Sequence, residues 1–184
     1  MNNLMIDIET LGTDHTAPIL SIGAVFFDPE EGALGRTFYK VIDLISAAEH
    51  SIIDADTVKW WMRQSEEARA IFNQYEAVTL SEALNALSEF ISENGDPNKI
   101  KVWGNGSNFD NTILRVNFDK VGISTPWKFY NDRDVRTIVD VTRSVTGVDV
   151  RKEFTLEGTV HNALDDALHQ VKYVNHAYKL LRDN

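Results

Sequence analysis

The chain has 184 residues, of which 43% are hydrophobic and 25% are charged, and this balance is typical of one soluble globular domain spanning residues 1–184. It contains no cysteine, which excludes disulfides and thiolate metal sites, so any metal must be held by oxygen or by histidine nitrogen. The formal net charge of −10 disfavours long-range attraction to nucleic acid. No apolar run has the length of a membrane span and the first residues lack the features of a signal peptide, so we expect no membrane partner and a cytoplasmic location.

The first part of the chain favours strands. Residues 3–9 form the first predicted strand, and residues 10–14 supply the glycine and aspartate of a turn. A second strand is predicted over residues 19–28, closed by Pro29 and Gly32, and a third over residues 36–41. Together they predict an antiparallel meander.

The remainder alternates between helix and strand. We predict helices at residues 56–62 with Asp56 as the cap, at 66–72 and at 81–93, followed by a short strand at 101–104. A helix at 109–118, a short strand at 128–131, a helix at 134–145 capped by Asp134, and a last helix at 162–181 complete the pattern. This order predicts a mixed α/β sheet flanked by helices.

Two carboxylates stand two positions apart inside the first apolar strand. Because strand side chains alternate, Asp7 and Glu9 emerge on one face while Ile6 and Ile8 face the other way. Like charges this close repel unless a proton or a cation lies between them, and clustered carboxylate oxygens suit Mg²⁺ or Mn²⁺. The alternative is that both acids are solvated on an edge strand.

Two later segments carry candidate residues of the same kind. In the first, the strand at 101–104 ends in a glycine-rich turn and Asp110 opens the next helix, either as a site residue or as its cap. In the second, His161 precedes a helix whose first turn holds Asp165 and Asp166. Acids in a first helical turn are also favoured by the helix dipole alone, and helix geometry does not choose between the two aspartates.

In this order the three segments resemble the signature of the DEDDh 3′–5′ exonucleases. The matching residues are Asp7-Ile8-Glu9, then Asn105-x-x-x-Phe109-Asp110, then His161-x-x-x-x-Asp166. The resemblance implies a ribonuclease H-like mixed β-sheet, and it selects Asp166 because the family's last acid lies five residues after its histidine. Residues 56–65 and 133–137 further resemble the branch of mycobacterial-type 3′–5′ exoribonuclease-like proteins of bacteria and phages.

The resemblance also implies a mechanism. Asp7, Glu9, Asp110 and Asp166 would hold two Mg²⁺ or Mn²⁺ ions about 3.5–4 Å apart, and His161 would take the proton of the attacking water. The expected activity is hydrolysis from the 3′ end of single-stranded or overhanging RNA, or DNA, releasing nucleoside 5′-monophosphates. A competing hypothesis is a catalytically silent ribonuclease H-like module that binds nucleic acid or a protein.

Contacts with the terminal nucleotide are expected next to the acids. Thr10, Leu11 and Gly12 lie just beyond the first pair, although Leu11 equally fits an ordinary turn residue that touches the core. Phe109 is a candidate stacking face or a packing residue, and Asn105 is a candidate for orienting substrate or a simple turn residue.

Two further candidates come from the helices. Trp60 and Trp61 are about 100° apart on a helix, so one of them can stack on a base, and the alternative is that both are core or dimer contacts. We predict base stacking for Trp61 and a core or dimer contact for Trp60. Arg136 is a candidate phosphate contact, with pairing to Asp132 or Asp140 as the alternative.

The other histidines lack a carboxylate at ligand spacing. We therefore expect surface positions for His15, His50, His169 and His176. A homodimer is a further expectation, which rests on the resemblance alone.

Overall fold

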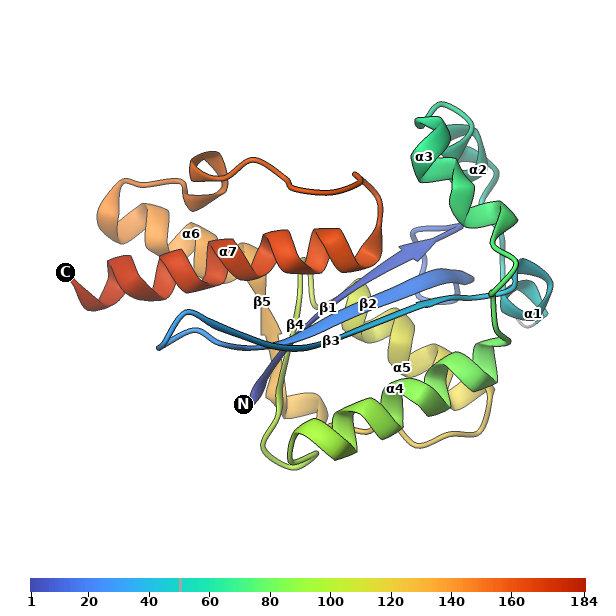
Figure 1. Ribbon diagram of the computed structural model, residues 1–184, viewed down its shortest axis with the longest axis horizontal. Helices are drawn as coiled ribbons and strands as arrows, with labels where there is room; N and C mark the ends of the chain where they lie inside the picture. The colour runs from blue at the N-terminus through green and yellow to red at the C-terminus, as the bar shows by residue number, and fades with distance from the viewer. Residues whose placement is uncertain (50) are drawn as a thin grey trace.

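Five strands form one mixed sheet in the order β3-β2-β1-β4-β5 (Figure 1), in a computed structural model that describes residues 1–49 and 51–184. The strands are β1 (Asn3–Thr10), β2 (Ile19–Asp28), β3 (Ala33–Val41), β4 (Lys101–Gly104) and β5 (Asp132–Asp134). The first three are the predicted antiparallel meander, and β4 and β5 run parallel to β1. The strand that carries the first two acids is therefore the central strand of the sheet.

Helices cover both faces of this sheet. The described helices are α1 (Leu44–Ala48), α2 (Ala55–Trp61), α3 (Glu66–Arg69), α4 (Leu80–Asn94), α5 (Asp110–Lys120), α6 (Val135–Thr146) and α7 (Ala163–Arg182), with short 3-10 turns η1 (Ala70–Asn73), η2 (Phe129–Asn131) and η3 (Val150–Glu153). Figure 1 shows α6 and α7 on one face, α4 and α5 on the other, and α1, α2 and α3 at one end of the sheet.

The alternation of β1 divides the apolar core in two. Leu4, Ile6 and Ile8 belong to the cluster on the side of α4 and α5, whereas Met5 belongs to the cluster on the side of α6 and α7. Asp7 and Glu9 are two and four positions after Met5, so they lie on the same face of β1 and face α7. Burial of large apolar side chains on both faces holds the central strand in place.

The predicted strand at residues 128–131 is wrong. Residues Phe129–Asn131 form η2, and the strand follows at Asp132–Asp134. The shift has a clear cause, because the Asp132 carboxylate accepts hydrogen bonds from Asn111 Nδ2 at 2.9 Å and Trp127 Nε1 at 2.9 Å and pairs with Arg115. These contacts fix Asp132 beside β4.

Helix starts were predicted with mixed success. Asp134 caps α6 as predicted, since its side chain accepts a hydrogen bond from the Thr137 N–H at 2.9 Å. The cap of α2 is Asp54 rather than Asp56, because the Asp54 carboxylate accepts from the N–H groups of Asp56 and Thr57. In the described part of the chain, no helix combines the length and apolarity needed to cross a membrane.

The histidine prediction holds only in part. His15 is exposed, and His50 lies outside the described residues. His169 and His176 are half-buried, with ring centroids 4.7 Å from Tyr173 and 5.6 Å from Phe154. Both line surface pockets, so the expected surface position holds in part, with an aromatic ring packed against each histidine.

Candidate active site

The start of α7 lies directly against the sheet at Gly23. Gly23 pairs with Asp7, and a Cβ atom on Gly23 would lie 2.2 Å from the Ala163 carbonyl carbon and the Leu164 nitrogen. Only glycine leaves room for this approach, which brings the first turn of α7 over the face of β1 that carries Asp7 and Glu9. Asp166, in that first turn, is thereby placed next to both acids.

Asp110 joins Asp7, Glu9 and Asp166 from the segment that follows β4, the neighbour of β1 on the side opposite β2. It is the first residue of α5, directly after the loop that follows β4, and it is 3% exposed. A Cβ on Gly104 would lie 2.5 Å from Asn111 Oδ1, so the glycine lets α5 begin close to the strand end. The position before the helix belongs to Phe109, and the Asp110 side chain is buried among the other acids.

The four carboxyl groups lie close enough for their charges to raise the pKa values of Asp7 and Glu9. Burial raises the pKa of Asp7 well above its ordinary value, and the charges of Asp110, Glu9 and Asp166 raise it further. Burial raises the pKa of Glu9 to about 8, again helped by Asp166 and Asp110. The structure therefore confirms that the four predicted acids converge; their catalytic role stays a prediction.

Asp110 and Asp166 show the same tendency with different partners. Burial raises the pKa of Asp110, although backbone N–H groups of Ile8 and Asn105 and the charge of Arg136 act in the opposite direction. Burial raises the pKa of Asp166 to about 6, while its hydrogen bond from the His161 N–H opposes the rise. A raised pKa means that no positive charge or sufficient set of hydrogen bonds stabilises the ionised carboxylate in its buried position.

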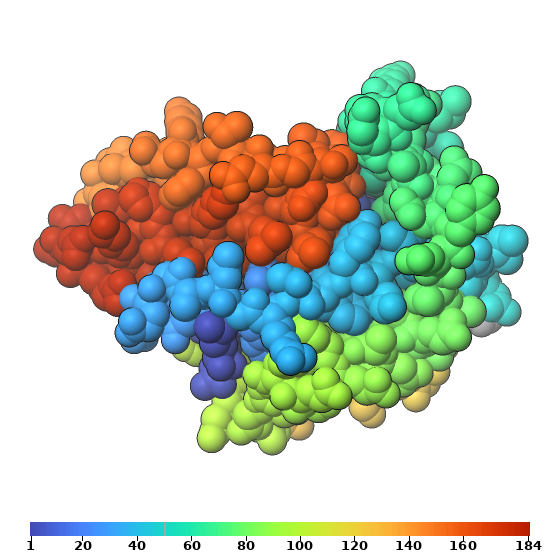
Figure 2. Space-filling view, in the orientation of Figure 1, coloured from blue at the N-terminus to red at the C-terminus, as the bar shows by residue number. Residues whose placement is uncertain are grey.

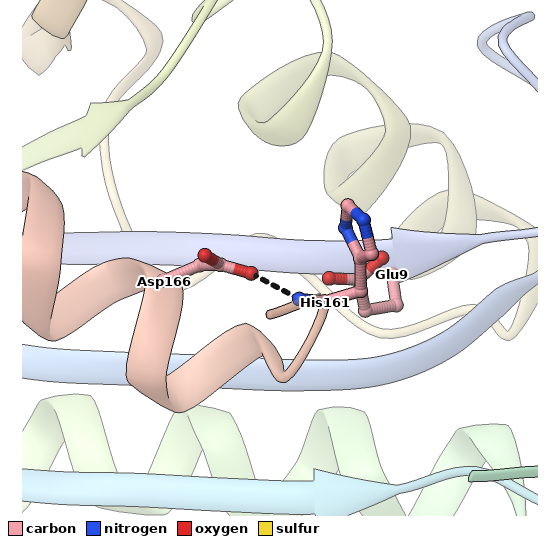
Figure 3. A group of neighbouring side chains, drawn as sticks. All are labelled: Glu9, His161 and Asp166. Carbon is pink, nitrogen blue, oxygen red and sulfur yellow. Dashed lines mark hydrogen bonds between the residues drawn. The ribbon is translucent and has the colours of Figure 1, made fainter. Parts of the chain in front are cut away.

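His161 lies at the rim of the acid cluster. Ligand atoms of Glu9, His161 and Asp166 all lie within 4.8 Å of one another, and Figure 3 shows the two carboxylates pointing toward each other beside the histidine. The backbone of His161 has a φ of 64°, and its N–H donates to Asp166 Oδ2 at 3.0 Å. Burial lowers the pKa of His161, which favours the neutral imidazole.

The two aspartates of α7 have separate tasks. Asp165 Oδ2 accepts a hydrogen bond from the Thr159 N–H at 2.8 Å, so this side chain holds the loop before α7. Asp166 instead faces Glu9 and His161. The structure thus agrees with the choice of Asp166.

Gln170 is a site residue that the sequence analysis missed. Its side chain is 4% exposed, and Nε2 donates to Asp7 Oδ1 at 2.7 Å. Its Oε1 has no hydrogen-bond partner among the described residues. The signal was present in the sequence, because Gln170 follows Asp166 by four positions and is a polar residue beside the buried stripe of α7.

A pocket of about 400 Å³ opens beside Glu9. Thr10, Gly12 and Phe109, which are three of the predicted nucleotide contacts, line it together with Trp60. The full lining is Ile8, Glu9, Thr10, Gly12, Thr13, Asp54, Asp56, Thr57, Trp60 and Phe109. Apolar rings and backbone next to a carboxylate suit the base and sugar of a terminal nucleotide.

The two tryptophans differ in burial, and the more buried one is the predicted stacking residue. Trp61 is 2% exposed and its Nε1 donates to the Thr10 carbonyl at 2.9 Å, so the prediction that it stacks on a base is wrong. Trp60 is 41% exposed, and its ring lies edge-to-face against His161 with centroids 4.7 Å apart. Leu11 is 3% exposed and belongs with Trp61 to a third, smaller buried apolar cluster, so its side chain is a core residue, as the alternative interpretation predicts.

The end of the molecule formed by α2 and α3 lies next to His161 at the rim of the acid cluster. Figure 2 shows α2 and α3 standing beside the segment that precedes α7, with the surface hollowed between them. The hollow is a cleft of about 320 Å³ lined from Gln64 to Ala68 on one side and from Gly158 to His161 on the other.

Asn105 and Arg136 line a different groove. This groove has a volume of about 620 Å³, and its lining is Asn105, Val135, Arg136, Val139, Asp140, Arg143, Arg151 and Tyr173. The alternative pairing of Arg136 is wrong for the described residues, because Asp140 pairs with Arg143 and Asp132 pairs with Arg115. The positive charge of Arg136 instead acts to lower the pKa of Asp110.

These features define the class of protein. A central strand with two acids, a third acid at the start of α5 and a fourth in α7 beside a histidine match the pattern of a DEDDh exonuclease on a ribonuclease H-like sheet. The model of the 3′–5′ exoribonuclease Rv2179c-like domain family matches residues 2–178, and the chain belongs to this family. The resemblance found in the sequence is confirmed, and so is the predicted 3′–5′ exonuclease class.

Relatives and solved structures agree with this assignment. The exodeoxyribonuclease of Enterobacteria phage T4 is 29% identical over 210 residues, which cover 97% of this chain and 90% of the phage protein. The nuclease domain of 3′hExo bound to rAMP superposes with a TM-score of 0.61 at 14% identity, covering 99% of this chain and 92% of that one.

Two further structures share the fold over part of their length. Cell-death related nuclease 4 has a TM-score of 0.70 at 12% identity, and 95% of this chain covers 62% of it. E. coli exonuclease I in complex with a dT13 oligonucleotide has a TM-score of 0.69 at 17% identity, with 98% of this chain covering 42% of it. The chain thus spans less than two thirds of these two proteins, and at such identities the likeness shows the fold, which confirms the predicted ribonuclease H-like mixed sheet.

Proposed function

We propose that this exonuclease removes nucleoside 5′-monophosphates one at a time from the 3′ end of single-stranded or overhanging RNA, with DNA as the close alternative. The observation that carries the proposal is the meeting of four carboxyl groups, two buried and two half-buried, with an imidazole at their rim. The family description names an exoribonuclease, whereas the phage T4 relative is named an exodeoxyribonuclease, so the two sugars are compared directly in the test below.

The carboxylate cluster fits two Mg²⁺ or Mn²⁺ ions. Asp7, Glu9, Asp110 and Asp166 would hold them, because hard oxygen donors suit these cations and the raised carboxyl pKa values mark uncompensated charge. When bound, the ions would supply positive charge for the attacking and the leaving oxygens of the phosphodiester.

His161 would act as the general base. Burial keeps its imidazole neutral at physiological pH, so a ring nitrogen is free to take the proton of the attacking water. The N–H bond to Asp166 and the edge contact with Trp60 hold the ring at the rim of the cluster. The proton then passes to the 3′ oxygen of the departing strand or to solvent.

The pocket beside Glu9 would receive the terminal nucleotide. Phe109 and Trp60 line it with aromatic rings, which would stack on a base, and Thr10 and Gly12 line it as well. A base held here places the adjacent phosphate at the carboxylates, which would give the enzyme its 3′ polarity.

A catalytically silent binding module is the competing function. Loss of at least one of the five site residues is the expected mark of such a protein, whereas here all five are present and gathered. The homodimer and the cytoplasmic location stay predictions made from the sequence.

The test compares end-labelled RNA and DNA oligomers of one sequence with Mg²⁺, for the parent, Asp7→Asn and Asp119→Asn. Asp119 is an exposed acid on α5, so its change matches the lost charge without touching the site. We expect the parent and Asp119→Asn to shorten 5′-labelled strands stepwise and Asp7→Asn to be slower by at least about a hundredfold. Equal rates for Asp7→Asn and the parent, or first release of the 5′ nucleotide, would contradict the proposal.

A further inference from the structure

The groove next to the acid cluster concentrates arginine on an acidic chain. Arg136 and Arg143 come from α6 and Arg151 from η3, and Tyr173 of α7 completes the wall of the 620 Å³ groove. The net charge of the chain is −10, so this grouping runs against its overall composition. Guanidinium groups match phosphate oxygens in geometry and charge.

The inner end of the groove meets the catalytic carboxylates. The Asn105 N–H and the Arg136 charge both act on Asp110, and the charge of Asp166 acts on Tyr173. The Arg136 guanidinium lies over the loop after β4, where a Cβ on Gly106 would be 3.2 Å from its Cζ. The groove therefore begins within electrostatic reach of the acids.

The groove and the nucleotide pocket lie on two sides of one loop. Asn105 at the start of the loop lines the groove, while Phe109 at its end lines the pocket beside Glu9. The two hollows share no lining residue. A strand whose terminal base fills the pocket and whose scissile phosphate meets the acids has this groove as a path for its next nucleotides.

The outer arginines extend that path away from the acids. Arg143 follows Arg136 by seven positions, two helical turns or about 10.5 Å along the same face of α6. Arg143 pairs with Asp140 at 2.6 Å and Arg151 with Asp149 at 2.8 Å. Both arginine side chains are more than half exposed, so each guanidinium can still reach a phosphate. The exposed Arg143–Asp140 pair contributes little free energy, so phosphate can replace its carboxylate, whereas Arg151 donates to Asp149 through both Nε and Nη2 and would share its guanidinium.

We propose that this groove binds the sugar-phosphate backbone on the 5′ side of the scissile bond, with Arg143 and Arg151 contacting successive upstream phosphates. The proposal rests on the exonuclease function and names the substrate as a single-stranded tail of several nucleotides. Because arginine reads phosphate rather than base, binding here is independent of sequence and decreases with salt.

The test compares two substrates that differ in the presence of upstream phosphates. The p-nitrophenyl ester of thymidine 5′-monophosphate has none, whereas a ten-nucleotide single strand fills the groove. The variant is Arg143→Gln with Arg151→Gln, and the matched control is Arg36→Gln with Arg182→Gln, which removes the same charge from β3 and from the end of α7. Thermal melting verifies that both fold.

The expected result is a fall of at least tenfold in the ratio of kcat/KM on the strand to kcat/KM on the ester, expressed mainly in KM and absent from the control. The slope of log kcat/KM against log salt becomes shallower by about 1.4, since each lost single-strand phosphate contact removes about 0.7. An unchanged ratio overturns the groove proposal, whether activity on both substrates is retained or falls by the same factor. If the parent cleaves neither substrate, the exonuclease function itself fails, which separates the two outcomes.

Discussion

The substitution Glu9→Gln should stabilise the metal-free protein against unfolding and weaken its response to Mg²⁺. Glu9 is 9% exposed, and its pKa is raised to about 8 by burial and by the charges of Asp166 and Asp110. Glutamine keeps the shape of the side chain and removes the charge. We therefore expect the variant to be more stable than the parent without metal and to lose much of the stabilisation that Mg²⁺ gives.

The size and pH dependence follow from proton linkage. Below pH 4.5 Glu9 binds a proton in both states; above it the unfolded chain loses the proton, while the folded chain retains it up to about pH 8. The folded state therefore binds more protons in this window, and the free energy of unfolding of the parent falls as the pH rises. A pKa change from 4.5 to about 8 corresponds to at most on the order of 5 kcal/mol.

The assay is thermal unfolding from pH 5 to pH 8.5 in EDTA and in Mg²⁺. At pH 8.5 in EDTA we expect Glu9→Gln to melt roughly 5–15 °C above the parent, a difference that shrinks toward pH 5. Glu89→Gln, an exposed change on α4, should melt with the parent at each pH. Equal melting temperatures of Glu9→Gln and the parent at pH 8.5, or a difference that grows toward acid, would refute the reasoning.

Three further changes test how the site is positioned. Gly23→Ala should lower the free energy of unfolding by at least about 2 kcal/mol and reduce activity, because α7 lies where the new Cβ would stand; parental melting and activity would show that α7 adapts freely. Trp60→Ala, more than Trp60→Phe, should lower kcat and move the acid limb of the pH–rate profile to higher pH, because exposing His161 reverses the burial that lowers its pKa; a limb at the parental pH would speak against this contact. Gln170→Leu should raise the Mg²⁺ concentration needed for half-maximal activity about 10–100-fold by removing the hydrogen bond to Asp7, and an unaltered Mg²⁺ dependence would leave Gln170 without that role.

The features predicted well are those that depend on local pattern. Alternation along β1 placed Asp7 and Glu9 on one face, and the spacing after His161 selected Asp166. Gln170 was within reach of the same reasoning, since a polar side chain beside a buried stripe, one turn after a candidate ligand, invites a partner.

The features missed depend on contacts between distant parts of the chain. Helical geometry separates Trp60 from Trp61 by about 100°, but which ring is buried is decided by the Thr10 carbonyl, 51 positions away in sequence. The displaced fifth strand has the same origin, because the hydrogen bond from Asn111 to Asp132 spans 21 positions. Local propensity contains no information about either partner.

The acids at positions 7 and 166 stand near opposite ends of the sequence, yet they belong to one cluster on the central strand. The cluster is therefore complete only after α7 has packed against β1. A polypeptide cut before residue 161 would therefore lack both the histidine and the fourth acid of the cluster.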